Sequence, residues 1–239
     1  MATPRASAHA VEEGLRRLHR ARGDAASMRF ARAAGDPAAE SFGRQALAVY
    51  ASAMNWLEGS DDFDTAHNEL HEVGRYCREE FPAGCDLTTD GDDFAQRCPV
   101  SLVHQRVGLS MGFTGNAICS ICDLDVSECP HRPGHSYEVV ASAHLNGRCN
   151  VCGSKACTNH LSGEIYEAET RVSITEIYEI DHIALVAQPV QPDARLTSIP
   201  ISRRELEAHL GLTIADGLSV RCDQCLGECQ GFTQIRFGD

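Results

Sequence analysis

Apolar residues recur every three or four positions through the first 82 residues, and this spacing predicts a helical N-terminal region. Asp36-Pro37 has the composition of a helix start, with Asp as the cap and Pro in the first turn. A second helix should end at Gly59, and Ser60 or Asp61 should cap a third that ends at Phe81-Pro82. The apolar stripes contain Val11, Leu15 and Leu18, then Phe42, Ala46, Val49, Ala53, Met54 and Leu57, then Phe63, Ala66, Leu70, Val73 and Cys77.

After Pro82 the helical period disappears, and Gly, Pro, Asp and Cys become frequent. Residues 137–145 and 164–187 have the alternating pattern of β-strands, and Pro189 ends the second run. Ser202-Arg-Arg-Glu205 has the pattern of a capping box before a short helix that Gly211 closes. We therefore expect an α+β fold in three parts: a helical region (1–82), a loop-rich β domain (83–200), and a C-terminal helix with a cysteine cluster (201–239).

The chain has 239 residues, 12 of them Cys, and its 34 acidic residues outnumber 21 basic ones, which gives a formal net charge of −13. This acidity argues against non-specific binding to nucleic acid or anionic membranes. The sequence contains neither a signal-peptide pattern nor a long apolar run, so we expect a cytoplasmic protein, in which disulfides are rare. Residues 1–35 carry seven Arg and three acidic groups, whereas residues 36–100 carry 4 basic and 14 acidic groups. These regions are either separate solvated faces or surfaces that attract each other, within the chain or between copies.

A repeated cysteine pattern gives the twelve cysteines a different role. Module 1 (119–137) and module 2 (149–166) each contain C-x2-C, then a third Cys, then a His that begins the pattern H-x2-G-x2-Y. Three thiolates and an imidazole complete a tetrahedral shell of the kind that zinc prefers. Four protein ligands leave no position for a substrate water, so both sites should be structural. The expected ligands are Cys119, Cys122, Cys129 and His131, and Cys149, Cys152, Cys157 and His160.

Six further cysteines allow up to two more zinc sites. Cys222, Cys225 and Cys229 have the spacing C-x2-C-x3-C, and their fourth ligand could be His104, Cys98, His182 or His209. Cys77, Cys85 and Cys98 with His104 form a looser candidate, although Cys77 and Cys85 could instead be core residues. His67 and His71 have the i, i+4 spacing of metal ligands, but Glu72 is one place too late for the H-E-x-x-H pattern. We interpret this pair as a polar helix face.

Two short motifs resemble those of tailed-phage prohead proteases. Val107-Gly-Leu-Ser-Met-Gly-Phe113 resembles their G-L-S-x-G-F stretch, and Tyr178 to Pro189 with Gln191-Pro-Asp-Ala194 resembles a later strand motif and its sequel. Some phage-associated proteins also carry a Cys/His insert similar to module 1. The resemblance covers about residues 105–200 and implies that Ser110 would be the nucleophile. That family places its His base well before the Ser, whereas here His104 is only six residues upstream. We expect a non-catalytic relative in which Gly108, Ser110 and Gly112 permit close strand packing.

Three functions follow from these patterns. The first is a zinc-stabilised structural protein, without enzymatic activity, that contacts a protein partner or a second copy and is phage- or phage-defence-related. The second is a serine peptidase that uses Ser110 and His104. The third is a specific nucleic-acid-binding zinc protein, which we consider the least supported, because residues 119–166 contain only three basic side chains: Arg132, Arg148 and Lys155.

Overall fold

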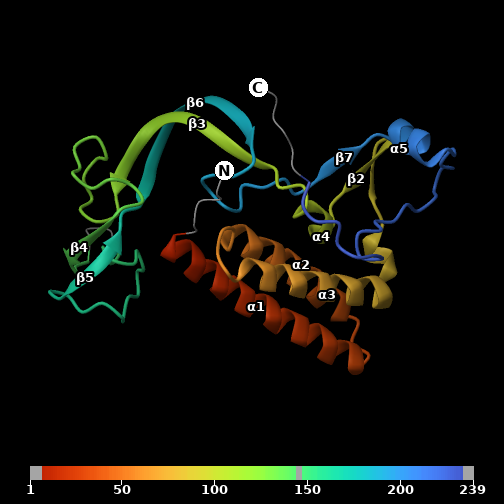
Figure 1. Cartoon of the computed structure of the whole chain (residues 1–239), viewed down its shortest axis with the longest axis horizontal. Coiled ribbons are helices and arrows are strands. Elements are labelled where there is room, and N and C mark those ends of the chain that lie inside the picture. The colour runs from red at the N-terminus through yellow and green to blue at the C-terminus, as the bar shows by residue number, and fades with distance from the viewer. Residues whose placement is uncertain (1–6, 144–146, 234–239) are drawn as a thin grey trace. The chain divides into compact units, whose positions relative to one another are not determined.

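A computed structural model describes residues 7–143 and 147–233 and confirms the α+β class (Figure 1). The chain divides into two compact units. Unit 1 comprises Met1–Ser110 and Leu185–Asp239, and unit 2 comprises Met111–Ala184. These bounds differ from the three consecutive segments of the sequence analysis, because the N-terminal helices and the C-terminal segment belong to the same unit. Among the described residues, no helix combines the length and apolar character that crossing a membrane requires.

Three helices form the core of unit 1, as predicted: α1 (Ala8–Ala33), α2 (Ala39–Trp56) and α3 (Phe63–Glu80). Gly43 allows these helices to approach closely, since a Cβ there would lie 2.6 Å from Met28 Sδ and 2.8 Å from Cys77 Sγ. Burying the apolar stripes stabilises this bundle by roughly 25 cal/mol per Å² of apolar surface removed from water. The largest fully buried side chains here are Leu18, Met28, Leu47, Met54, Leu57 and Leu70.

The helix starts follow the sequence only in part. Asp36 Oδ1 accepts the Ala38 N–H at 2.8 Å, and α2 begins at the next residue. The predicted cap of α3 is wrong, because Asp62 occupies the N-cap position without a side-chain capping bond. The Ser60 hydroxyl instead donates to the Leu57 carbonyl at 2.7 Å and so closes the preceding turn.

Charged side chains of α1 pair with those of α3. Arg22 contacts Glu69 at 2.6 Å, and Arg29 contacts Glu72 at 2.5 Å. Arg32 and Glu80 form a third pair at 2.7 Å. The basic and acidic regions of the sequence therefore meet within one chain. Because these pairs are largely exposed, each contributes at most about 1 kcal/mol.

Unit 1 also contains a small antiparallel sheet. It has the order β1-β2-β7, formed by Thr88–Asp90, Asp93–Gln96 and Ile199–Ile201. The 3-10 helix η1 (Pro82–Cys85) precedes the sheet, α4 (Pro99–Leu102) follows β2, and α5 (Arg203–Leu210) follows β7. Gly211 closes α5 at φ 68°, as predicted. The capping-box bond is absent, because the Ser202 side chain makes no cap contact and the Arg203 N–H donates to Asp93 at 2.9 Å.

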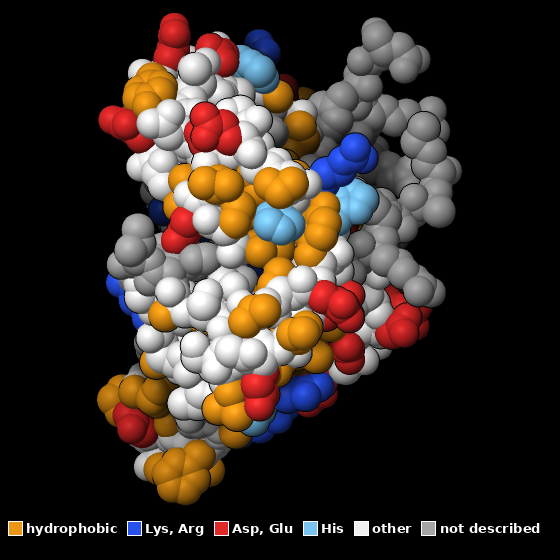
Figure 2. Space-filling model, turned by 90° about the vertical axis from the view of Figure 1, so that its left-hand side faces the viewer, with side chains coloured by type: hydrophobic (Ala, Val, Ile, Leu, Met, Phe, Trp, Pro, Cys, Tyr) orange, Lys and Arg blue, Asp and Glu red, His pale blue; other side chains and the backbone are white. Residues whose placement is uncertain are grey.

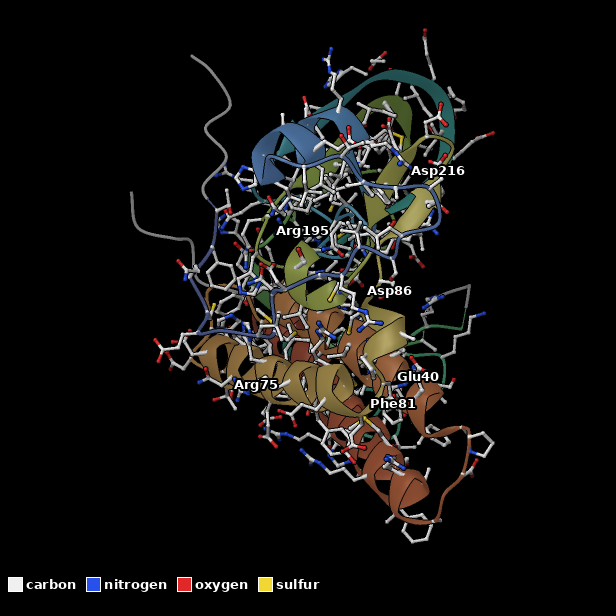
Figure 3. All side chains as sticks on the ribbon, turned by 90° about the vertical axis from the view of Figure 1, so that its right-hand side faces the viewer. Glu40, Arg75, Phe81, Asp86, Arg195 and Asp216 are labelled. Atoms are coloured by element: carbon white, nitrogen blue, oxygen red, sulfur yellow. The ribbon has the colours of Figure 1, made fainter. Side chains whose placement is uncertain are left out.

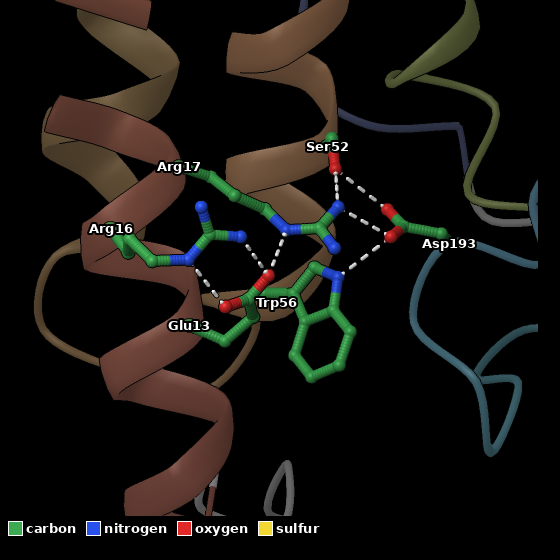
Figure 4. A network of polar contacts seen from close by, with 6 residues as sticks. All are labelled: Glu13, Arg16, Arg17, Ser52, Trp56 and Asp193. Atoms are coloured by element: carbon green, nitrogen blue, oxygen red, sulfur yellow. Dashed lines mark hydrogen bonds and ion pairs between the residues drawn. The ribbon is translucent and has the colours of Figure 1, made fainter. Parts of the chain in front are cut away.

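Asp193 joins the segment after β6 to the first two helices (Figure 4). Its carboxylate accepts hydrogen bonds from Ser52 Oγ and Trp56 Nε1, each at 2.8 Å, and pairs with Arg17 at 2.5 Å. Glu58 makes a second connection, since it pairs with both Arg106 and Arg195. The stretch that resembles the phage motif sequel thus has a structural role in unit 1.

Two strand pairs build unit 2. The strand β3 (Gly108–Cys119) pairs with β6 (Val172–Val186), and β4 (Ser136–Val140) pairs with β5 (Ile165–Glu169). The predicted strand 164–187 is therefore two strands that belong to different pairs. A Cβ at Gly112 would lie 2.2 Å from the His182 ring, which agrees with the expected close packing of the small residues. Figure 2 shows apolar side chains reaching the surface on the side that carries these strands.

Candidate metal centres

Each repeated module brings its three sulfurs and one imidazole nitrogen together in unit 2. The four ligand atoms of each module lie within 4.8 Å of one another. In both modules the third Cys lies 3.3 Å from His Nδ1, and the first Cys lies 3.7 Å from it. The second and third sulfurs are 3.4 Å apart in module 1 and 3.5 Å apart in module 2. A tetrahedral shell of nitrogen and sulfur ligands has edges of about 3.3–3.8 Å, so both groups could hold a metal ion.

Backbone N–H groups point toward the ligand sulfurs, in the C-x2-C turn of module 1 and at the third cysteine. The Ile121 N–H donates to Cys119 Sγ at 3.4 Å, and the His131 N–H donates to Cys129 Sγ at 3.3 Å. The residue after each turn has positive φ, 58° at Asp123 and 74° at Gly153. Although burial opposes ionisation, hydrogen bonds from the backbone of His160 and Asn159 lower the pKa of Cys157 to about 6. Such donors stabilise the thiolate that a metal requires.

A tyrosine supports the histidine of each module, which explains the H-x2-G-x2-Y repeat. Tyr137 meets the His131 ring edge-on, with centroids 4.8 Å apart and planes at 79°. Tyr166 and His160 repeat this arrangement at 4.7 Å and 79°. Each tyrosine hydroxyl also accepts the N–H of the residue after the histidine, at 2.9 Å in module 1 and 3.1 Å in module 2. The tyrosine therefore fixes both the ring and the backbone of a ligand.

The two modules exchange equivalent hydrogen bonds. In module 1 the Ser120 N–H donates to the Arg171 carbonyl at 2.9 Å, and the Arg171 N–H donates back to Ser120 Oγ at 2.8 Å. In module 2 Asn150 makes the same two contacts with Ser142, at 3.0 and 2.8 Å. The C-x2-C turn of module 1 is thus bonded to Arg171, shortly after β5 of module 2. The C-x2-C turn of module 2 is bonded to Ser142, shortly after β4 of module 1. The modules interlock and form one folding unit.

The strand pair β4–β5 has the same twofold relation. Tyr137 faces Ala168, Tyr166 faces Val139, and Glu138 faces Glu167 at the centre. The 29-residue displacement of the repeat exchanges the first two pairs and maps the third onto itself. The side chains buried between the modules are Cys119, Ile121, Val139, Ala141, Cys149, Val151 and Ala168.

A third group forms in unit 1 from residues far apart in the sequence. His67 and His71 on α3 meet His104, which follows α4, and Cys229 in the C-terminal segment. The three imidazole Nε2 atoms are 3.1 to 3.2 Å apart, and Cys229 Sγ lies 3.1 Å from His104 and 3.6 Å from His67. This group could also hold a metal ion. His71 is only 6% exposed and lies with His67, His104 and Cys229, so the pair is not a solvated polar face of α3.

The surroundings of the third group keep its imidazoles neutral. Burial, followed by the neighbouring His67 and His104, lowers the pKa of His71 to about 4. Burial also lowers the pKa of His67 and of His104. His104 Nδ1–H donates to the Val100 carbonyl at 2.5 Å, which leaves its Nε2 lone pair directed at the group. A neutral imidazole is the form that coordinates a metal.

The remaining candidate residues lie outside these three groups. Cys77 lies in the helical core with its sulfur 3.7 Å from Met28 Sδ, as the core interpretation anticipates. His182 lies against Gly112, and His209 is in the last turn of α5. Cys85, Cys98, Cys222 and Cys225 belong to none of the groups.

Both ring nitrogens of His104 are engaged, one by the Val100 carbonyl and the other by the His/Cys group. His104 therefore lacks the free nitrogen that a general base for Ser110 would need, and a serine without a positioned base is a weak nucleophile. The arrangement argues against the Ser110–His104 peptidase.

Comparison with family models, with curated proteins and with solved structures gave no match to this chain. Functional conclusions therefore rest on the geometry of the three groups.

Proposed function

We propose that this chain is a zinc-binding structural protein whose closed Cys/His sites hold a scaffold for protein–protein contacts. The observation that carries the proposal is the grouping of four nitrogen and sulfur ligands, three times, at the spacing of a tetrahedral shell. Thiolate and imidazole ligands favour zinc over magnesium or calcium. Zinc at about 2.3 Å from sulfur and about 2.0–2.1 Å from nitrogen would match the separations in all three groups.

The ligand count favours a structural role over a catalytic one. Each group supplies four protein ligands, so a tetrahedral ion bound there keeps no position for a water or a substrate. Tyr137 and Tyr166 orient His131 and His160, and the Val100 carbonyl orients His104. Groups that contact the ligands in this way fix their orientation at metal sites.

Unit 2 depends on metal for its stability. Its buried apolar cluster consists mainly of cysteines and small aliphatic residues from the two modules. Two-stranded antiparallel pairs are marginal in water on their own. Binding of structural zinc is worth on the order of 10–16 kcal/mol in small zinc-finger peptides, which is enough to determine whether such a unit folds.

An exposed apolar surface on the strand β6 supports the protein-contact part of the proposal. Ile174, Tyr178 and Ile180 share one face of β6 and are between 50% and 58% exposed, and an apolar surface of this kind marks a contact site. Their burial against a protein partner or a second copy would stabilise both. A phage-related setting rests on the motifs around Ser110 and Gln191.

The experiment compares the full chain with a double variant, I174T/I180T, which keeps β propensity while removing apolar surface. We expect unchanged zinc content and at least a tenfold weaker self-association or partner affinity, measured by sedimentation velocity and by titration. Leu212→Thr is the matched control, because Leu212 is similarly exposed in unit 1. An assembly that survives the double variant unchanged would contradict the assignment of this surface. A unit 2 that stays folded without zinc would contradict the metal assignment.

A further inference from the structure

The three groups use seven of the twelve cysteines, and Cys77 is a core residue. The other four lie in unit 1, on segments that the fold brings together. We propose that Cys85, Cys98, Cys222 and Cys225 form a fourth, closed zinc site with four thiolate ligands. The proposal extends the proposed function, and it joins cysteines that the sequence divides between two different candidate sites.

The backbone places Cys85 beside Cys222. The Cys222 N–H donates to the Cys85 carbonyl at 3.0 Å, and the Leu87 N–H donates to the Val220 carbonyl at 2.7 Å. Between these bonds Asp86 and Arg221 form an isolated antiparallel bridge, and their side chains pair at 2.7 Å. Figure 3 shows Asp86 where the chain leaves the helices. The segment around Arg221 therefore runs antiparallel to the residues that follow η1.

Cys98 follows β2 at the end of the β1–β2 pair where β1 begins, so it lies at the same end of the sheet as Cys85. Its thiol forms a hydrogen bond with the Cys222 sulfur, and the Gln96 side chain also contacts Cys222. The Gln96 carbonyl oxygen accepts the Cys98 N–H at 2.8 Å, which fixes the cysteine just before α4. One glutamine thus orients two of the four cysteines.

Cys222 and Cys225 form a C-x2-C turn with the backbone features of the two modules. The Gln224 N–H is directed at the Cys222 sulfur, as the Ile121 N–H is at Cys119 Sγ in module 1. Cys225 packs against the helical core, where the absence of a side chain at Gly74 leaves room for its sulfur. A Cβ at Gly74 would lie 2.9 Å from Cys225 Sγ.

The burial of the four cysteines suits a metal site that is closed to solvent. Cys85 and Cys222 are at most 9% exposed, and Cys98 and Cys225 pack against the helical core. Four thiolates placed together at such a site would be stable only with a compensating metal ion. Arg44 supplies a second positive group, since its N–H contacts Cys85 Sγ at 3.5 Å.

The site would interleave with the third group along the chain. Residues 98–104 carry one ligand of each site, on either side of α4. Residues 222–229 carry two ligands of the fourth site and Cys229 of the third. Two ions would then link residues 222–229 to unit 1, one through Cys222 and Cys225 and the other through Cys229. This would hold in place a C-terminal segment in which few of the described apolar side chains are buried.

The test is native mass spectrometry of the full chain, with cobalt as the spectroscopic probe. We expect four metal ions per chain, and cobalt–thiolate absorption that corresponds to eleven bound thiols instead of seven. Cys85→Ser should bind three ions, whereas Cys77→Ser, the matched control, should keep four.

Three ions in the wild-type protein, with all four of these thiols alkylated under native conditions or joined as disulfides, would overturn the fourth site. That result leaves the three described groups intact, so it is distinguishable from a failure of the proposed function. The wild-type measurement also decides the matter if Cys85→Ser does not fold.

Discussion

Glu138 lies directly opposite Glu167 on β4 and β5, with one Cys/His module on each side. The two modules are related by a twofold exchange about this pair, as two subunits would be in a symmetric dimer. Each module also holds the C-x2-C turn of the other through Arg171 or Ser142. We therefore expect the two modules to unfold together, so a substitution that destabilises one module should also destabilise the other.

The central glutamate pair makes a first prediction. Like charges directly opposite each other in an antiparallel pair are destabilising, so Glu138→Lys should stabilise zinc-loaded protein by about 0.2–1 kcal/mol. Urea denaturation followed on unit 2 would measure the change. Glu179→Lys on β6 makes the same charge change away from the pair and should have no comparable effect. A lower denaturation midpoint for Glu138→Lys would contradict the pairing.

The second prediction concerns the tyrosines. Tyr137→Phe and Tyr166→Phe each remove the acceptor for a backbone N–H beside a ligand, which should cost about 0.5–1.5 kcal/mol. Both variants should keep their zinc but release it faster to a chelator. Tyr76→Phe, on α3 in unit 1, serves as the control. If only one of the two variants released zinc faster, the equivalence of the modules would be refuted.

A ligand substitution tests the interlocking. Cys152→Ser should release the ion of module 2 and destabilise unit 2 by on the order of 4 kcal/mol or more, as loss of a metal site does. Because the modules share hydrogen bonds, zinc in module 1 should also become easier to remove.

Ser110→Ala should leave zinc content and stability unchanged, and active-serine probes should not label the wild-type protein. Labelling at Ser110 would restore the peptidase hypothesis.

The third group predicts a pH dependence. Without metal, the pKa of His71 is about 4 in the folded chain, below the ordinary value of 6.5. The unfolded chain then binds more protons between these values, so the unfolding free energy should fall as the pH is lowered from about 6.5 to 4. Above pH 6.5 this contribution is fully present. Urea titrations of metal-free protein between pH 7.5 and 4.5 would show the slope, and His71→Gln should flatten it. Equal slopes in the two proteins would contradict the burial of His71.

The sequence predicted the features that depend on local spacing. The ligands of module 1 lie within 13 residues, and the second module repeats them, so the C-x2-C turn, the Gly and the Tyr could be assigned without a structure. The three helices also follow from their apolar period, and Gly211 ends α5 as expected.

The third group could not be predicted in this way, because Cys229 is 162 residues from His67. An i, i+4 histidine pair looks the same on a solvated helix face as in a metal site. The division of the remaining cysteines likewise depends on β1, β2 and β7, whose three or four residues are too few to show a period. The predicted N-cap bonds of α3 and α5 are absent because other contacts replace them: Ser60 bonds to the Leu57 carbonyl, and the Arg203 N–H donates to Asp93.

The most direct test of the account is the metal content of the purified full chain, measured together with its fold. We predict at least three zinc ions per chain by native mass spectrometry, and loss of the β signal of unit 2 by circular dichroism when a strong chelator removes them. A chain that binds fewer than two zinc ions, or that keeps the fold of unit 2 after complete zinc removal, would contradict it.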